Sequence, residues 1–140
     1  MLLSLPTTQG LLKIRNMMAD VVVKQSKIHG RGVFAARDFK KGEVVIQWHP
    51  KILTKMEMEK LTTEEKRYVE KINEETYYLM QEPERFVNHS CEGNARIGNS
   101  CDVAVRDIKI GEEILSDYNN EGMVEFDCTC GSGHCRRRVK

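Results

Sequence analysis

Three cysteines crowd the C-terminal end of the chain, in the run Cys128-Thr-Cys-Gly-Ser-Gly-His-Cys135. Thiols at this spacing are more typical of a metal site than of core packing. Zinc takes four ligands in a tetrahedron and favours thiolate sulfur, so this cluster lacks one ligand. The spacing therefore predicts a structural zinc site, and the residues that could supply its fourth ligand are Cys91, Cys101, His89 and His134.

The metal interpretation depends on a reducing compartment, since clustered thiols in an oxidising one more often form disulfides. The first 19 residues hold short apolar clusters, but Pro6, Gly10 and Lys13 interrupt them and no small-residue cleavage site follows. No stretch approaches the roughly 18 apolar residues of a membrane span. We therefore expect an intracellular protein, cytoplasmic or nuclear or nucleoid-associated, with no membrane partner.

Length and charge limit the possible partners. A chain of 140 residues corresponds to about one domain. Its formal net charge is +1, but four of its 22 basic residues lie in the tail after Cys135, and 18 basic and 21 acidic residues remain before it. This balance suits a basic peptide substrate better than nucleic acid, so we expect no direct nucleic-acid binding. A mixed, solvated surface would show the same balance.

Short strands dominate the predicted secondary structure. Segments rich in β-branched or aromatic residues and bounded by turn residues predict strands at 21–24, 33–37, 44–48, 76–80, 102–106 and 113–116. Between residues 54 and 72, a capping box at Thr62-Thr-Glu-Glu65 precedes apolar residues at helical spacing, which predicts one helical insert. The fold class is therefore mainly β, a β-rich α+β domain.

Two segments, 37–45 and 106–114, share one pattern of a strand end, a turn and a new strand. Each turn holds a glycine, Gly42 or Gly111, that is free to adopt a positive φ angle. We predict two similar hairpin-like corners. Either an internal duplication or the same turn chemistry used twice would explain them.

Four further runs of sequence carry a family resemblance. Lys27-Ile-His-Gly-Arg-Gly-Val-Phe34, Arg85-Phe-Val-Asn-His-Ser-Cys-Glu-Gly-Asn94 and Gly111-Glu-Glu-Ile-Leu-Ser-Asp-Tyr-Asn119 resemble, in order, the signature motifs of SET-domain methyltransferases. The run Phe126-Asp-Cys-Thr-Cys-Gly-Ser-Gly-His-Cys-Arg136 resembles the post-SET zinc segment of that family. The resemblance covers residues 21 to 136, about the whole chain beyond its N-terminal arm.

The resemblance implies a fold and a division of the chain. It implies short strands in small sheets, a pseudoknot at the active site and one helical insert. Residues 1–20 would be an N-terminal arm, either disordered or an upstream start, residues 21–120 the SET catalytic domain, and residues 121–140 the post-SET zinc tail. In this family the cysteine of Asn-His-Ser-Cys completes the zinc site, so the implied ligands are Cys91, Cys128, Cys130 and Cys135. Cys101 is then a small, half-buried residue.

The implied activity is that of a protein-lysine N-methyltransferase, which transfers a methyl group from S-adenosylmethionine to a lysine of a histone or another basic protein. Two alternatives remain, an inert zinc-stabilised module that binds lysine-rich peptides and a redox-sensing thiol protein. By resemblance, the backbone of Gly30, Arg31 and Gly32 lines the methionine end of the donor, Asn88 and His89 hydrogen-bond it, and Phe126 covers its adenine. Arg85 would form either a donor contact or a structural ion pair.

The catalytic residues implied are Tyr118 and Tyr78. The hydroxyl of Tyr118 would orient the lysine nitrogen, and desolvation beside a sulfonium lowers the pKa of that amine, so no strong base is needed. Tyr77 or Tyr78 would wall the lysine channel, because successive strand residues face opposite ways, and we favour Tyr78.

Two positions depart from the family pattern. Gly93 stands where the family has proline, and we expect it to loosen the loop that follows Cys91. Ser116 stands two residues before Tyr118, where the family often has an aromatic residue that limits the number of methyl groups. A smaller residue there predicts di- or trimethylation. The alternative is a water molecule held by Ser116, which would restore a one-methyl limit.

Overall fold

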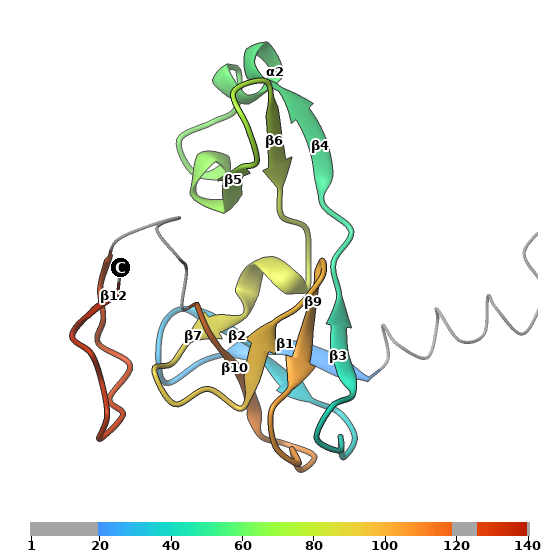
Figure 1. Ribbon diagram of the computed structural model, residues 1–140, viewed down its shortest axis with the longest axis vertical. Coiled ribbons are helices and arrows are strands. Elements are labelled where there is room, and N and C mark those ends of the chain that lie inside the picture. The colour runs from blue at the N-terminus through green and yellow to red at the C-terminus, as the bar shows by residue number, and fades with distance from the viewer. Residues whose placement is uncertain (1–19, 119–125, 140) are drawn as a thin grey trace, which may run out of the picture.

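The computed structural model describes residues 20–118 and 126–139, and most of its elements are short strands (Figure 1). The largest sheet has the order β1 (Val21–Gln25), β2 (Arg31–Ala35), β10 (Glu113–Asp117), β8 (Ala95–Ile97), β9 (Cys101–Ala104) and β3 (Val44–Gln47), and β7 (Asn88–His89) pairs with β10 off this path. The predicted mainly β fold is confirmed. The predicted N-terminal arm lies outside the described residues, apart from Asp20. None of the helices in the described part of the chain is long and apolar enough to cross a membrane.

A smaller module lies above this sheet in Figure 1. It contains the antiparallel sheet β4 (Lys51–Thr54), β6 (Thr76–Leu79) and β5 (Val69–Lys71), the helix α2 (Lys55–Glu59) and a 3-10 turn at Glu65–Tyr68. Its core contains Leu53, Tyr77 and Leu79. A second 3-10 turn at Glu84–Phe86 leads from the module back to β7. The module therefore forms one wall beside the strands that carry the signature motifs.

The prediction of one helical insert between residues 54 and 72 is wrong in extent. Its capping box forms as expected, because Glu65 N–H donates to Thr62 Oγ1 at 3.2 Å and Thr62 N–H donates to Glu65 Oε2 at 2.9 Å. The helix nevertheless ends after one 3-10 turn, and Val69 begins strand β5 by pairing with Leu79. Strand pairing and the fit of a β-branched residue in a sheet outweigh the local helical pattern.

Strand β10 passes between two strands that are close in sequence. Ser116 pairs in parallel with His89 of β7 on one side and with Ala95 of β8 on the other. The loop 90–94, which joins β7 to β8, must therefore cross over β10, as the predicted pseudoknot requires. The side-chain amide of Asn94 stabilises this crossing with two hydrogen bonds to the backbone of β10. Its Nδ2 donates to Glu113 O at 2.8 Å, and its Oδ1 accepts from Leu115 N–H at 2.9 Å.

The expectation that Gly93 loosens this loop is wrong. A Cβ atom at Gly93 would lie 2.4 Å from Leu115 O and 2.8 Å from Asp117 N. Both distances are shorter than any ordinary van der Waals contact, so the crossing needs glycine for close approach of two backbones. The loop that carries Cys91 is tightly packed.

The two predicted corners pack against each other. Gly42 and Gly111 have φ angles of 91° and 89°, and Phe39 forms a bridge with Ile108. Lys41 N–H donates to Asp107 Oδ1 at 2.9 Å, while Ile110 N–H donates to Asp38 Oδ1 at 2.8 Å. The reciprocal contacts close the base of the domain around buried Phe39 and Ile108.

The C-terminal tail forms a separate hairpin at the side of the main sheet (Figure 1). Strand β11 (Phe126–Asp127) pairs with β12 (Arg138–Val139), and Cys128 N–H donates to Arg137 O at 2.7 Å. Among the tail residues whose side chains the structure describes, Val139 and Cys128 are the buried apolar ones. An ordered tail therefore needs a further source of stability, such as bound metal.

Candidate active site and metal centre

Two cavities meet at Tyr118, the residue that follows β10. The first, of about 950 Å³, lies between the 28–31 turn, the 85–89 segment and the tail. The second, of about 740 Å³, lies between the β5–β6 module and strand β9. Tyr118 lines both cavities, as do Val87, Arg67, Tyr68 and Arg85. A group bound in either cavity could therefore reach the same phenol.

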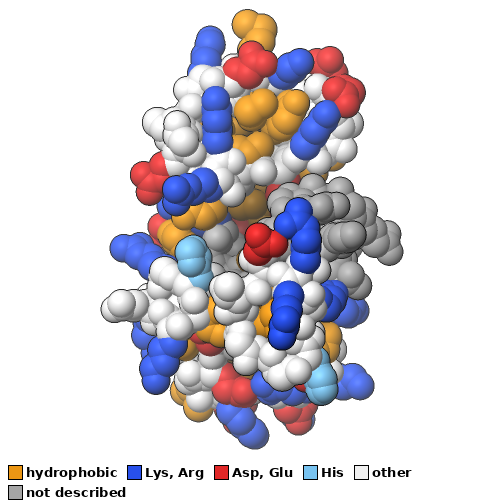
Figure 2. Space-filling view, turned by 90° about the vertical axis from the view of Figure 1, so that its left-hand side faces the viewer, with side chains coloured by type: hydrophobic (Ala, Val, Ile, Leu, Met, Phe, Trp, Pro, Cys, Tyr) orange, Lys and Arg blue, Asp and Glu red, His pale blue; other side chains and the backbone are white. Residues whose placement is uncertain are grey.

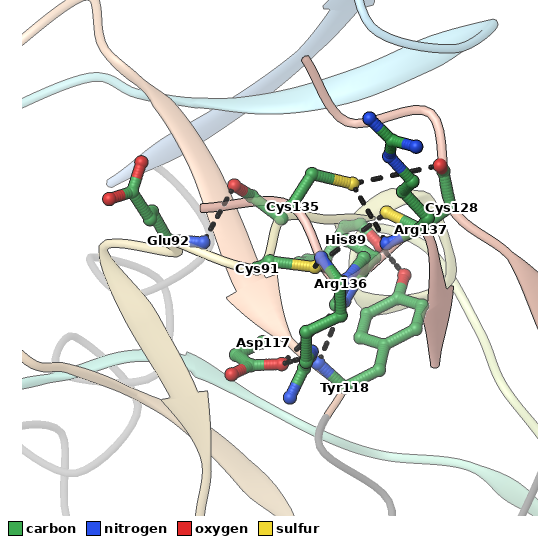
Figure 3. Close-up of polar contacts among 11 residues, drawn as sticks. His89, Cys91, Glu92, Asp117, Tyr118, Cys128, Cys135, Arg136 and Arg137 are labelled. Atoms are coloured by element: carbon green, nitrogen blue, oxygen red, sulfur yellow. Dashed lines mark hydrogen bonds and ion pairs between the residues drawn. The ribbon is translucent and has the colours of Figure 1, made fainter. Parts of the chain in front are cut away.

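The side chain of Tyr118 is fixed at both ends. Its hydroxyl donates to the carbonyl oxygen of Val87, and its backbone N–H donates to Nδ1 of His89 at 3.0 Å (Figure 3). Desolvation and the nearby carboxylates of Asp102 and Glu70 raise the pKa of Tyr118 above its ordinary value. The hydroxyl therefore stays protonated at neutral pH, with its lone pairs able to accept a hydrogen bond.

His89 joins this tyrosine to the cysteines. Its Nδ1 accepts from Tyr118, so the proton of the neutral ring lies on Nε2, which is 3.3 Å from the sulfur of Cys91 (Figure 3). Burial lowers the pKa of His89, against the opposing effect of Asp117, and favours this neutral form. The ring is thus a rigid link between the metal-ligand cluster and the phenol-bearing backbone.

Asn88 fixes the other side of the first cavity. Its Nδ2 lies within hydrogen-bond distance of three acceptors, His29 O at 3.0 Å, Arg31 O at 2.9 Å and Glu113 Oε1 at 3.0 Å. Gly32 provides the room for this arrangement, because a Cβ atom there would lie 2.1 Å from Glu113 Oε1. Asn88 therefore holds the β1–β2 turn against β10.

Most of the predicted donor-binding residues line the first cavity. They are Gly30, Arg31, Arg85, Asn88, His89 and Tyr118. Gly32 is not among the lining residues. Its lack of a side chain instead leaves room for the side chain of Glu113. The side chain of Phe126 and the residue Asn119 lie outside the described part of the structure, although the backbone of Phe126 begins β11 beside the cavity-lining residue Asp127.

Arg85 makes the contacts of a structural residue and also reaches the cavity. It forms an ion pair with Glu82 at 3.2 Å, and its guanidinium lies 5.0 Å from the ring centres of both Tyr68 and Phe86. Its Nε is buried with no hydrogen-bond partner among the residues described. The structural ion pair predicted as one alternative is present, and a donor contact through Nε is compatible with it.

The second cavity has aromatic walls. Tyr78 is half-buried and lines it together with Trp48 and Tyr118, whereas its neighbour Tyr77 points into the core of the β4–β6 module. Strand alternation therefore turns Tyr78, and not Tyr77, toward the cavity. Sequence patterns did not indicate Trp48, which follows β3, or Asp102 of β9, because both reach this cavity only after the two strands have paired.

Four cysteines come together at the edge of the first cavity. The sulfur atoms of Cys91, Cys128, Cys130 and Cys135 all lie within 4.8 Å of one another. The sulfurs of Cys91 and Cys128 are 3.8 Å apart, which matches the roughly 3.8 Å that two thiolates adopt on a tetrahedral zinc with Zn–S bonds of about 2.3 Å. The donor set and its spacing therefore fit Zn²⁺.

Backbone N–H groups donate hydrogen bonds to these sulfurs and so favour the thiolate form that binds a metal cation. The N–H groups of Arg136 and Arg137 lie 3.4 Å from the sulfurs of Cys91 and Cys135 and donate to them (Figure 3). Burial raises the pKa of Cys128 to about 12. Burial also disfavours ionisation of Cys130, but N–H groups of Cys91 and Ser132 outweigh it and lower the pKa of that thiol to about 6. Full ionisation of the cluster therefore needs a metal.

The other candidates for the fourth metal ligand lie elsewhere. His134 is exposed, and its Nδ1 lies 2.7 Å from Glu92 Oε1. Cys101 lies in β9 and is buried, not half-buried as predicted. His89 contacts Cys91 from outside the cluster. The spacing of residues left this choice open, and of the four candidates the fold places Cys91 within the cluster.

The tail is also bound to β10 directly. The guanidinium of Arg136 forms an ion pair with Asp117, one residue before Tyr118 (Figure 3). Cationic and acidic side chains are otherwise interspersed over the face shown in Figure 2, with apolar side chains exposed between them on the β4–β6 module. The described residues on this face form no single charged stripe.

Comparisons with known proteins agree with this architecture. A family model described as SET domain matches residues 30–119. The Variant-silencing SET domain-containing protein of Plasmodium falciparum is 32% identical over 146 residues, covering 86% of this chain. The Histone-lysine N-methyltransferase ASHH2 of Arabidopsis thaliana is 30% identical over 135 residues, covering 80% of this chain. The Histone-lysine N-methyltransferase trithorax of Drosophila virilis is 30% identical over 156 residues, covering 96%.

These relatives are far longer proteins, since the chain spans only 6%, 8% and 4% of their respective lengths. Among solved structures, a crystal structure of a "putative histone methyltransferase" from Plasmodium falciparum has a TM-score of 0.61 at 19% identity. The match covers 74% of this chain and 96% of that one. At this identity the likeness establishes the fold.

Proposed function

The chain belongs to the SET-domain family, and from this premise we propose that it is a protein-lysine N-methyltransferase that uses S-adenosylmethionine as its methyl donor. The observation that supports this proposal best is the meeting of two separate cavities at Tyr118. A methyl transfer needs a donor and an acceptor brought together from opposite sides of one reacting centre, and positioning accounts for most of its rate. Two of the relatives carry histone-lysine N-methyltransferase in their names.

The first cavity suits the donor. Its volume of about 950 Å³ lies at the upper end of the 300–1,000 Å³ typical of ligand sites. Gly30, with a φ angle of 46°, and the amide of Asn88 hold the 28–31 turn open at its wall. When bound there, the donor would supply an electrophilic methyl group on its sulfonium. Gly30, Arg31, Arg85, Asn88, His89 and Phe126 would hold it.

The second cavity suits the lysine side chain. Tyr78 and Trp48 offer apolar walls that desolvate an amine and lower its pKa, so that the neutral form becomes accessible. Tyr118 is the catalytic residue in this proposal. Its hydroxyl donates to Val87 O, and an oxygen lone pair can accept an N–H of the amine and orient the nitrogen toward the first cavity.

We assign a structural Zn²⁺ to Cys91, Cys128, Cys130 and Cys135. Such a site would supply the folding free energy that the small tail lacks. The tail lines the first cavity through Asp127, Cys128, Thr129 and Cys130. The metal would therefore act on donor binding through the tail, without entering the reaction.

The substrate in this proposal is a lysine-containing protein, such as a histone or another basic protein. The experiment that tests the function is incubation of the protein with isotope-labelled S-adenosylmethionine and a whole-cell extract of its source, with the Tyr118→Phe variant as control. Label on lysine that depends on Tyr118 supports a methyltransferase. Calorimetry with the unlabelled donor gives a second test, because a protein that shows no heat of binding is an inert module.

A further inference from the structure

The second cavity combines its aromatic walls with buried acid groups. Its lining includes three carboxylates, Glu70, Glu84 and Asp102. Of these, Asp102 is 2% exposed and Glu84 is 4% exposed, whereas charged side chains are rarely buried without a partner. The fold therefore places buried carboxylates in the wall of the cavity that Tyr118 also lines, with Glu84 paired to His49 at 3.4 Å.

The buried carboxylate of Asp102 has a hydrogen-bond donor but no cationic partner among the described residues. Trp48 Nε1–H donates to its Oδ2 at 2.6 Å, but no ion pair joins Asp102 to a cation within residues 20–118 and 126–139. Burial raises the pKa of Asp102 to about 6, and the charges of Glu84 and Glu70 act in the same direction. The group is still ionised at neutral pH. Buried charges that have a purely structural role are normally paired, so this one lacks a counter-ion.

A second group beside Asp102 also lacks a partner. Ser116 is fully buried, and its hydroxyl makes no hydrogen bond of ordinary geometry to the residues described. It lies close enough to the Asp102 carboxylate to lower the pKa of that group. In contrast, Glu113 accepts hydrogen bonds from both Ser26 and Asn88. Unused hydrogen-bonding capacity is therefore concentrated at the inner end of the second cavity.

The cations of this cavity lie nearer its surface. Arg67 and Lys71 are exposed, and Lys71 forms an ion pair with Glu74 at 2.7 Å. Arg85 is engaged by Glu82 and by two aromatic rings. None of the three has Asp102 as its ion-pair partner in the described structure. A cation that enters from solvent would thus find the inner carboxylate available.

We propose that Asp102 is a substrate-binding residue that attracts the amine in its positively charged form, so that the cavity selects an ammonium or methylammonium group over an uncharged side chain; the bound amine then loses its proton to solvent before its neutral form reacts at Tyr118. The aromatic faces of Trp48, Tyr78 and Tyr118 would enclose the same cation, since aromatic rings attract ammonium groups electrostatically. That the amine belongs to a lysine rests on the proposed function; the binding of a cation does not.

The test uses the one tryptophan of the chain, Trp48, as a reporter of cavity occupancy. The full-length protein is titrated with choline and with its uncharged isostere 3,3-dimethylbutan-1-ol, and binding is followed by fluorescence and by calorimetry. We expect choline to bind at least about tenfold more tightly, the value of one charge-assisted contact. Asp102→Asn keeps the size of the side chain and an acceptor for Trp48 and should abolish the preference. A preference that survives in Asp102→Asn overturns the proposal.

Glu70→Gln is the matched control, because it removes a carboxylate from the same cavity. It should weaken choline binding less than about threefold, and an equal loss in both variants would overturn the assignment to Asp102. Thermal unfolding at pH 7.5 verifies that each variant is folded. If methyl transfer proceeds with an unchanged KM in Asp102→Asn, Asp102 is not the binding residue and the proposed function stands. If no methyl transfer occurs but choline selection depends on Asp102, the proposed function fails and this site stands.

Discussion

His89 accepts a hydrogen bond of 3.0 Å from the backbone N–H of Tyr118. This contact holds the residue that directly follows β10. The other nitrogen of the same ring lies 3.3 Å from the Cys91 sulfur. The position of the phenol is therefore linked to the order of the cysteine cluster through one side chain, and a change at either end should be detected at the other.

Replacement of Tyr118 by phenylalanine tests its catalytic assignment. The ring and its packing are kept, but the hydroxyl that donates to Val87 O is lost. Donor affinity should remain within about threefold of the wild type, while turnover should fall by 10² or more, at the scale of a lost transition-state contact. Calorimetry measures the first quantity and single-turnover kinetics the second. Equal losses in binding and rate would show that the tyrosine has a structural role.

Loss of the cysteine cluster should weaken donor binding as well as activity. In Cys128→Ser, or after chelation of bound metal, the tail loses its anchor, and with it the wall formed by residues 127–130. We expect donor affinity to fall by about tenfold or more, because a flexible wall must be ordered on binding. Calorimetry and metal analysis on the same samples test this. Unaltered donor affinity in metal-free protein would show that the tail is ordered without zinc.

Gly93→Ala tests the backbone crossing directly. The new Cβ would lie 2.4 Å from Leu115 O, so the loop must move away from β10, at a cost of about 2–4 kcal/mol in the free energy of unfolding. Gly133→Ala is the matched control, because nothing lies within 4 Å of a Cβ at that position in the tail. Denaturant unfolding should show a large loss for the first variant and a change within about 0.5 kcal/mol for the second. Similar stabilities would mean that the crossing is loose.

Asp102→Asn should stabilise the protein at neutral pH. The folded-state pKa of Asp102, about 6, lies above the ordinary value for aspartate, with Glu84, Glu70, Trp48 and Ser116 as its neighbours. The protonated carboxyl therefore makes its full contribution to the free energy of unfolding below about pH 4, and this contribution is lost as the pH rises through 6.

The variant never ionises at this position, so its free energy of unfolding should exceed that of the wild type by up to about 3 kcal/mol at pH 7.5. This difference should shrink on acidification and vanish near pH 4. Denaturant unfolding of both proteins across pH 4.5–8 measures the difference. A variant less stable than the wild type at pH 7.5 would show that the bond from Trp48 needs a carboxylate.

The sequence predicted the strands and the motif residues better than it predicted the cavities. Segments with clear alternation, such as residues 21–24 and 113–116, lie within one residue of β1 and β10. The region around Val69 was misjudged, because its pairing partner Leu79 lies in another strand and the local pattern was helical. Asp102 gave no signal at all, since its burial beside Trp48 arises only when β3 and β9 pair. Such contacts between distant segments depend on tertiary structure.

The number of methyl groups added should depend on Ser116. It is fully buried beside β7 and β8, its hydroxyl has no ordinary hydrogen-bond partner among the described residues, and the carboxylate of Asp102 is its neighbour. A serine leaves more room than an aromatic side chain would, and a carboxylate close by attracts the charged methylammonium, which must lose its proton before it accepts another methyl group. We therefore expect di- or trimethyl-lysine as the end product.

A water held by Ser116 would instead block the rotation of a methylated amine and stop the reaction at one methyl group. Mass spectrometry of a lysine peptide methylated to completion separates the two cases, and a product that never passes monomethyl-lysine refutes the expectation. Ser116→Tyr should shift a multiply methylated pattern back toward one methyl group. Ser116→Ala is the matched control: it removes the hydroxyl that could hold a water but adds no bulk, so it should leave di- or trimethyl-lysine as the main product.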